Sequence, residues 1–136
     1  MEYNLVHALI GRFGVLIPLL GLFFELGGII SRKRVISNIA GAIVILGCFL
    51  GILSGFTGFL EIKYLMSMNE AYHIYKIHYL IGGIISLLFT IILFIRIYLY
   101  YKISEKIIIF YFLIYTITIL GNLYSNEIII HILKGG

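Results

Sequence analysis

Charged side chains are scarce in this sequence. Only 12% of its 136 residues are Asp, Glu, Lys or Arg, whereas 62% are hydrophobic, and the mean hydropathy is +1.12. A soluble core of this length cannot bury so much apolar surface, so the composition predicts a chain that lies in a lipid bilayer. The net charge of +4 does not indicate a nucleic-acid partner, because the basic residues lie at helix ends and not in one patch.

The motifs of several common chemistries are also missing. Cys48 is the only cysteine, which excludes an internal disulfide, a zinc site built from several cysteines and a CxxCH motif for covalent haem. No glycine-rich phosphate loop leads from a strand to a helix, and no serine or cysteine stands beside a base. We interpret Cys48 as a packing residue. The first residues lack a positive leader, so we expect the first apolar run to be a retained helix.

Four long apolar runs fill most of the chain. A spanning helix needs about 20 apolar residues, so each run is long enough to cross a membrane. We predict an all-α fold, in which the whole chain, 1–136, forms one up-down-up-down four-helix bundle in the membrane. The predicted helices cover about 5–30, 35–60, 74–100 and 106–131.

The distribution of basic residues predicts the direction of the helices. The residues near the two tight turns are Arg32, Lys33, Arg34, Arg96, Lys102 and Lys106. At the opposite ends, basic residues are diluted by acidic ones. The positive-inside rule therefore predicts cytoplasmic tight turns, with both termini and the long second connection extracytoplasmic. We expect a multi-pass protein of the inner (cytoplasmic) membrane.

All four histidines fall at the predicted outer end. His73 precedes the third helix, where we expect a loop, and His131 closes the fourth helix. His7 and His78 both open the phrase His-x-Leu-Ile-Gly, at similar depth in the first and third helices. These helices are diagonal partners in an up-down-up-down bundle, so two imidazoles there can ligate one haem iron axially. The alternative is a helix-start phrase that recurs in a sequence rich in Ile and Gly.

Four further residues surround this pair in the prediction. Gly11 and Gly82 each lie one turn below a histidine and lack a Cβ, so a flat macrocycle or a neighbouring helix can approach. Arg12 is a charge inside the first helix, for which we expect a buried partner, either a haem propionate or Glu61. Glu61 ends the second helix, where it orients a ligand histidine, accepts a proton from a quinol or is simply solvated.

Two other polar positions receive a smaller role. Glu25 is near the inner end of the first helix, and we expect it to meet the basic turn 32–34 without taking part in chemistry. His131 shares a helix face with Glu127. It is an alternative metal ligand, or a residue that merely solvates the helix end.

Short motifs resemble a known family. Val6-His7 begins the first helix, Thr57-Gly58-x-x-Glu61 closes the second, and His78 opens the third. This pattern resembles the small four-helix prokaryotic membrane family called "domain of unknown function 2231", although Ala8-Leu9 replaces the Phe-Pro that usually follows the first histidine there. The resemblance implies a four-helix membrane domain with its histidines on one side, of a kind that looks like an electron-transfer module.

Together these patterns predict a membrane cytochrome subunit with one haem b near the extracytoplasmic face. His7 and His78 would be the axial ligands, and Gly11, Gly82, Arg12 and Glu61 would surround the haem. The hydrocarbon core of a membrane is about 30 Å thick, so one haem at one face cannot carry electrons from one side to the other. We expect electron exchange with a periplasmic c-type cytochrome or with membrane quinol, in a larger redox complex rather than a stand-alone enzyme.

Two alternatives stay open at this point. The first is a cofactor-free structural subunit, whose histidines solvate helix ends and whose glycines pack helices. The second is a small metal transporter or channel that uses His7, His78 and His131.

Overall fold

Four long helices make up the described part of the protein. The computed structural model describes residues 2–67 and 76–133, and the side chains of 5–64, 66–67 and 76–127 within them. The helices are α1 (Glu2–Ser31), α2 (Arg34–Ser67), α3 (Lys76–Tyr101) and α4 (Glu105–Leu133). The prediction of an all-helical, four-helix chain is confirmed. The second helix runs seven residues beyond its predicted end, to Ser67.

The helices have apolar outer faces and polar groups inside. Exposed fractions reach 57% at Leu16, 62% at Phe23 and 67% at Phe94. Glu25 and Glu61, by contrast, are buried. This distribution is the reverse of a soluble bundle and suits a lipid environment. By length and hydropathy, all four helices can cross a membrane, over Leu5–Ser31, Arg34–Tyr64, Lys76–Tyr101 and Glu105–Glu127.

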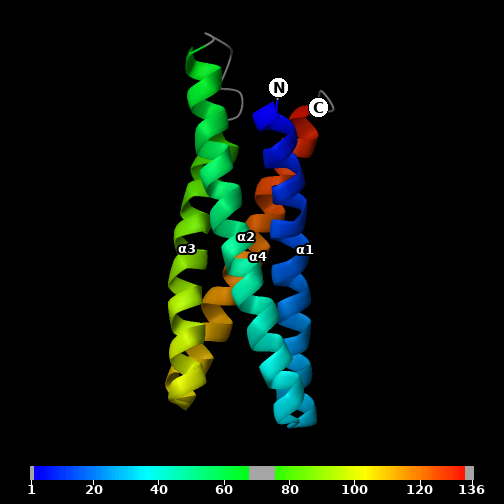
Figure 1. The fold of residues 1–136 in the computed structure, drawn as a ribbon, viewed down its shortest axis with the longest axis vertical. Helices are drawn as coiled ribbons and strands as arrows, with labels where there is room; N and C mark the ends of the chain where they lie inside the picture. Colours follow the sequence, from blue (N-terminus) through cyan, green and yellow to red (C-terminus); the bar gives the residue numbers. More distant parts are fainter. Residues whose placement is uncertain (1, 68–75, 134–136) are drawn as a thin grey trace.

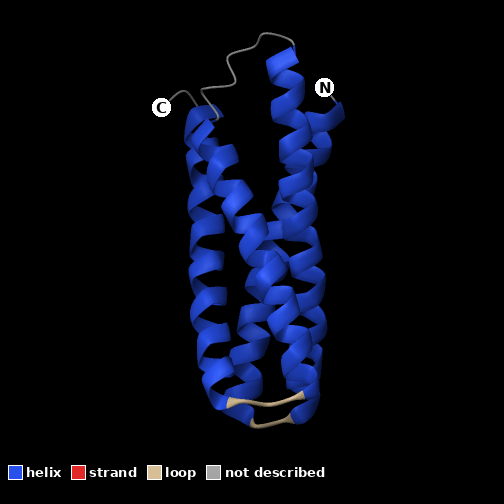
Figure 2. Ribbon diagram, turned by 90° about the vertical axis from the view of Figure 1, so that its left-hand side faces the viewer, coloured by secondary structure: helices blue, strands red, loops and turns tan. Residues whose placement is uncertain are grey.

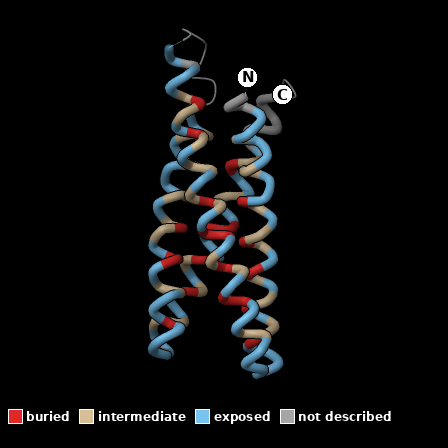
Figure 3. Tube along the Cα trace, in the orientation of Figure 1, coloured by how far each residue is buried: buried red, intermediate tan, exposed pale blue. Residues whose placement is uncertain are grey.

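The helices form one elongated bundle (Figure 1). The N- and C-termini lie at one end, and the two short described connections lie at the other (Figure 2). Helix α2 packs against α1 and α3, and α4 packs against α3 and more sparsely against α1. Among the described residues, no backbone contact joins α1 to α3 or α2 to α4, so these are the two diagonal pairs. The buried positions follow the bundle axis (Figure 3).

Glycines on α2 allow close helix packing in the middle of the bundle. A Cβ at Gly47 would lie 3.0 Å from the ring of Pro18 on α1, and a Cβ at Gly51 would clash with the ring of Phe89 on α3. Neighbouring rings occupy the space that a Cβ would take at each position. These two glycines therefore allow the helices to pack closely.

Pro18 creates an unusual contact between α1 and α4. Proline has no N–H, so the carbonyl oxygen of Gly14, one turn earlier, lacks its helical donor. The side-chain amide of Asn122 on α4 donates to that oxygen at 3.0 Å. One turn away, the hydroxyl of Tyr115 donates to the carbonyl oxygen of Pro18 at 2.6 Å. Two polar side chains thus fix α4 against α1, where helix contact is otherwise sparse.

We expect Asn122→Leu to lower the free energy of unfolding by about 1 kcal/mol, since interhelical hydrogen bonds in membranes have this size. In a Pro18→Ala background the loss should shrink, because the new amide at position 18 then donates to Gly14. A double-mutant cycle of unfolding free energies in detergent measures the difference. An equal loss in both backgrounds would contradict this role of Asn122.

Candidate functional site

His7 and His78 come together near the end of the bundle that carries the termini. Their ring centroids are 6.1 Å apart, and the ring planes are inclined by 65°. The ring of Tyr79 packs beside both, with centroid distances of 6.4 Å to His7 and 5.5 Å to His78. Two residues near the starts of diagonal helices therefore meet across the core.

Hydrogen bonds define which nitrogen of His7 carries the proton. The single hydroxyl proton of Thr57 is donated to the carbonyl oxygen of Ser54, at 3.0 Å. Nδ1 of His7 lies 2.9 Å from the same Thr57 oxygen, which can then only accept. Nδ1 is therefore the donor, and in the neutral ring Nε2 keeps a free lone pair.

His78 is held in the same way by α4. Its Nδ1 lies 3.1 Å from the carbonyl oxygen of Ser125 and 2.9 Å from the Ser125 hydroxyl. A carbonyl oxygen accepts only, so Nδ1 again carries the proton and Nε2 keeps the lone pair. Both imidazoles are thus oriented from behind by a partner on another helix, the arrangement usual for metal-ligating histidines.

Glu61 adds a third acceptor to this group. Its Oε2 atom lies 3.9 Å from Nε2 of His7. That oxygen is buried and finds no hydrogen-bond donor among the described side chains. The carboxyl group of Glu61 does have a hydrogen-bond partner in Tyr79, so only the Oε2 atom lacks a donor. Two imidazoles, a phenol and a carboxyl group therefore meet here, a set of groups that can hold a metal centre or an exchangeable proton.

The glycines differ in what surrounds them. A Cβ at Gly58 would lie 3.1 Å from the imidazole carbon Cε1 of His7, so this glycine makes room for the histidine ring. A Cβ at Gly11 would make ordinary contact with Ser54, at 3.7 Å. A Cβ at Gly82 would meet nothing within 4 Å. Of the two predicted cofactor glycines, Gly82 borders open space and Gly11 faces α2.

The other predicted site residues lie elsewhere. Arg12 is exposed on the outer surface of α1, and the described residues include no ion pair between it and Glu61. The expected contact between them is not formed, because Arg12 and His7 lie five residues apart and hence on different faces of the helix. His131 lies in α4, but its side chain falls outside the described part. His73 is outside the described residues altogether.

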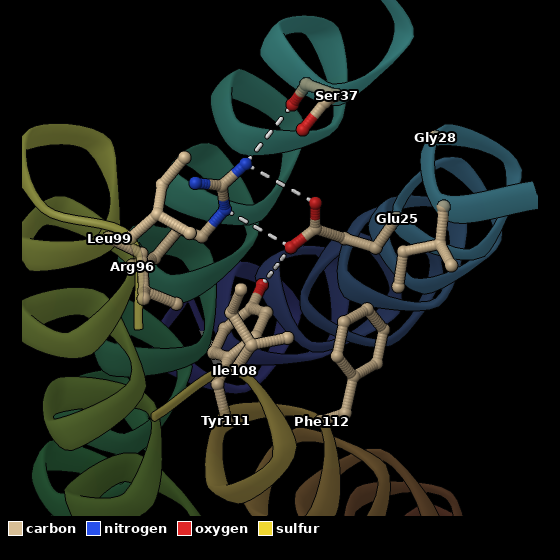
Figure 4. A pocket seen from close by; sticks show the side chains of 10 residues that line it. Glu25, Gly28, Ser37, Arg96, Leu99, Ile108, Tyr111 and Phe112 are labelled. Carbon is tan, nitrogen blue, oxygen red and sulfur yellow. Dashed lines mark hydrogen bonds and ion pairs between the residues drawn. The ribbon is translucent and has the colours of Figure 1, made fainter. Parts of the chain in front are cut away.

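A second polar cluster occupies the other end of the bundle (Figure 4). Arg96 of α3 forms an ion pair with Glu25 of α1, with Nε 3.1 Å from Oε2. Its Nη2 donates to Glu25 at 3.3 Å and to the carbonyl oxygen of Ser37 at 3.1 Å. The hydroxyl of Tyr111 also donates to Glu25.

The prediction that Glu25 meets the basic turn is therefore wrong. Arg32–Arg34 lie beyond or at the ends of α1 and α2 and are exposed, whereas Glu25 faces inward. Sequence reasoning missed Arg96 as a partner. Its position in the sequence indicates such a role, because Arg96 lies about one turn inside a spanning helix. A charged side chain at that depth in a bilayer usually has a partner of opposite charge.

Comparisons of the chain with protein families, with curated proteins and with solved structures found no match.

Proposed function

We propose that this protein is a membrane b-type cytochrome subunit with one haem bound between His7 and His78. The observation that carries the proposal is the pairing of two imidazoles from diagonal helices, each with Nδ1 hydrogen-bonded to a partner on a further helix. A metal–imidazole bond is about 2 Å long, so two imidazoles on one iron have centroids about 6 Å apart. The observed separation of 6.1 Å is compatible with such a pair, and it is equally that of a direct edge-to-face contact between the two rings.

A haem iron fits the donor set better than a bare metal ion. Within the described residues, no group of three or more His, Cys, Asp or Glu side chains is arranged to hold a metal ion. A bare ion needs about four protein ligands in a structural site and three in a catalytic one. An iron in a macrocycle takes only the axial ligands from the protein, and His7 and His78 supply two.

The surroundings assign further roles in the proposed site. A Cβ at Gly82 would meet nothing within 4 Å, so α3 can be approached closely one turn from His78, whereas His7 and Tyr79 fill the space beside Gly58. Bound haem supplies one-electron redox chemistry. Thr57 and Ser125 orient the imidazoles, and Glu61 faces His7, where it can hold a proton. Arg12 has no role in the proposed site, because it is exposed on a face of α1 that differs from that of His7.

The proposed topology is up-down-up-down, with both termini on the extracytoplasmic side of the inner membrane. It is supported by the basic residues at the two tight turns. Electron exchange would occur on the outer side, with a c-type cytochrome or membrane quinol, in a complex with other redox subunits. Two short motifs of the sequence also meet at the proposed site, because His7 is hydrogen-bonded to Thr57 and lies beside Glu61.

Two glycine variants on α3 test where the haem binds. Gly82→Leu should leave the fold of the haem-free protein intact, since a Cβ there meets nothing within 4 Å. It should lower haem content about tenfold or more, because the side chain fills the space beside His78. Gly83→Leu is the matched control, as position 83 is equally open but exposed. Haem per chain is measured as the pyridine haemochrome, and equal haem in both variants would contradict the proposed site.

A further inference from the structure

A pocket of about 180 Å³ lies at the end of the bundle remote from the histidines. All four helices contribute to its lining (Figure 4). The polar residues that line it are Glu25, Ser37, Arg96 and Tyr111, and its apolar part includes Leu99. Ligand pockets for whole small molecules are about 300–1,000 Å³, so this pocket suits a head group whose remainder lies outside.

Arg96 keeps hydrogen-bonding capacity after its internal contacts are made. A guanidinium has five N–H donors. The bonds to Glu25 and Ser37 use Nη2, and Nε faces Glu25. Among the described residues, no hydrogen bond engages the two N–H groups of Nη1. The planar group fits here because Gly41 has no side chain, since a Cβ there would lie 2.7 Å from Nη2. The available donors suit an acceptor ligand.

The charged residues around the pocket determine whether a negatively or a positively charged ligand is favoured. The carboxylate of Glu25 is balanced by the guanidinium of Arg96 and accepts from Tyr111. The exposed charged residues at this end are Arg32, Lys33, Arg34, Lys102, Glu105 and Lys106. Five of these six are basic, so the surrounding potential is positive and attracts anions to the pocket.

We propose that this pocket binds a phosphate group, that of an acidic phospholipid or free phosphate. Arg96 would donate to the phosphate oxygens, and the basic residues of the two turns would supply the remaining attraction. The pocket wall formed by Ile29, on the outward part of α1, is continuous with the apolar surface of the bundle. Acyl chains can therefore lie along that surface while the phosphate stays in the pocket. The site is separate from the histidines and does not depend on haem.

Native mass spectrometry of the purified full chain tests this site. Phosphatidylglycerol and phosphatidylcholine are titrated in turn, and we expect the acidic lipid to bind at least about tenfold more tightly, as charge-assisted hydrogen bonds predict. The double variant Glu25→Gln, Arg96→Gln should lose that preference without leaving a buried unpaired charge. Ile29→Trp should lose it too by blocking the pocket, and Ile30→Trp is its control, since Ile30 is 82% exposed and does not line the pocket.

Calorimetry with inorganic phosphate in lipid-free detergent identifies the source of the phosphate group. Binding that the double variant abolishes supports free phosphate as a ligand, whereas lipid binding without phosphate binding supports the phospholipid. Equal binding of the two lipids would overturn the proposal. So would a preference that survives in both the double variant and Ile29→Trp but disappears in Lys33→Gln, because that result indicates diffuse attraction to the basic turn.

Discussion

Replacing Arg96 by leucine is expected to destabilise the bundle by about 3–5 kcal/mol, the usual cost of breaking a buried ion pair from one side. The guanidinium contacts both Glu25 and the carbonyl oxygen of Ser37. Without it, the buried carboxylate keeps only the hydroxyl of Tyr111 as a partner. The carboxylate of Glu25 is only 6% exposed, so solvent replaces the lost donors poorly and the carboxyl group is left underpaired or becomes protonated.

The unfolding free energy in mixed detergent micelles measures this loss. The matched control is the double variant Glu25→Gln, Arg96→Leu, which removes both charges and should regain most of the lost stability. Lys33→Leu, at an exposed position of the same end, should stay within about 0.5 kcal/mol of the parent. A single Arg96→Leu variant as stable as the double variant would show that the ion pair has no structural role.

The second large effect concerns the histidine pair. His7→Ala and His78→Ala should each lower the haem content at least about a hundredfold, the upper range seen even for residues that only support a metal ligand. The stability of the haem-free protein should change much less, since each side chain makes hydrogen bonds to one neighbouring helix only. Haem content per chain and unfolding free energy, measured on the same preparations, separate binding from folding.

The two remaining histidines of the sequence provide controls for the histidine variants. His73→Ala and His131→Ala should retain haem, because the proposed iron takes its two ligands from α1 and α3. Thr57→Val should bind haem more weakly by about 10-fold or more, as it removes the acceptor that orients His7. If His131→Ala loses haem while His7→Ala keeps it, the ligand assignment is wrong.

The helices and the histidine pair were predictable because each depends on a signal within one segment. Apolar runs of spanning length define helices by themselves. His7 and His78 both lie in the first two turns of diagonal helices, so bundle geometry can bring them together without knowledge of individual contacts. Glu61 was placed beside them by the same reasoning from depth.

Contacts that depend on helix rotation were not predictable. Arg12 and Glu61 lie at the same end, yet Arg12 is on the outward face of α1. Glu25 was assigned to the turn nearest in sequence, whereas the rotation of α1 directs it to Arg96 on α3. Nearly every residue of these helices is apolar, so periodicity defines the inward face only weakly. The contact of Asn122 with Gly14 likewise depends on which face of α4 meets Pro18.

The reduced-minus-oxidised absorption spectrum of the purified chain, expressed with ample haem, tests the central claim most directly. We predict a sharp α-band on reduction, with one haem per chain and the low-spin signature of two axial imidazoles. The band should be absent from the double variant His7→Ala, His78→Ala. A colourless protein, or one that contains a metal but no haem, would contradict the assignment as a cytochrome.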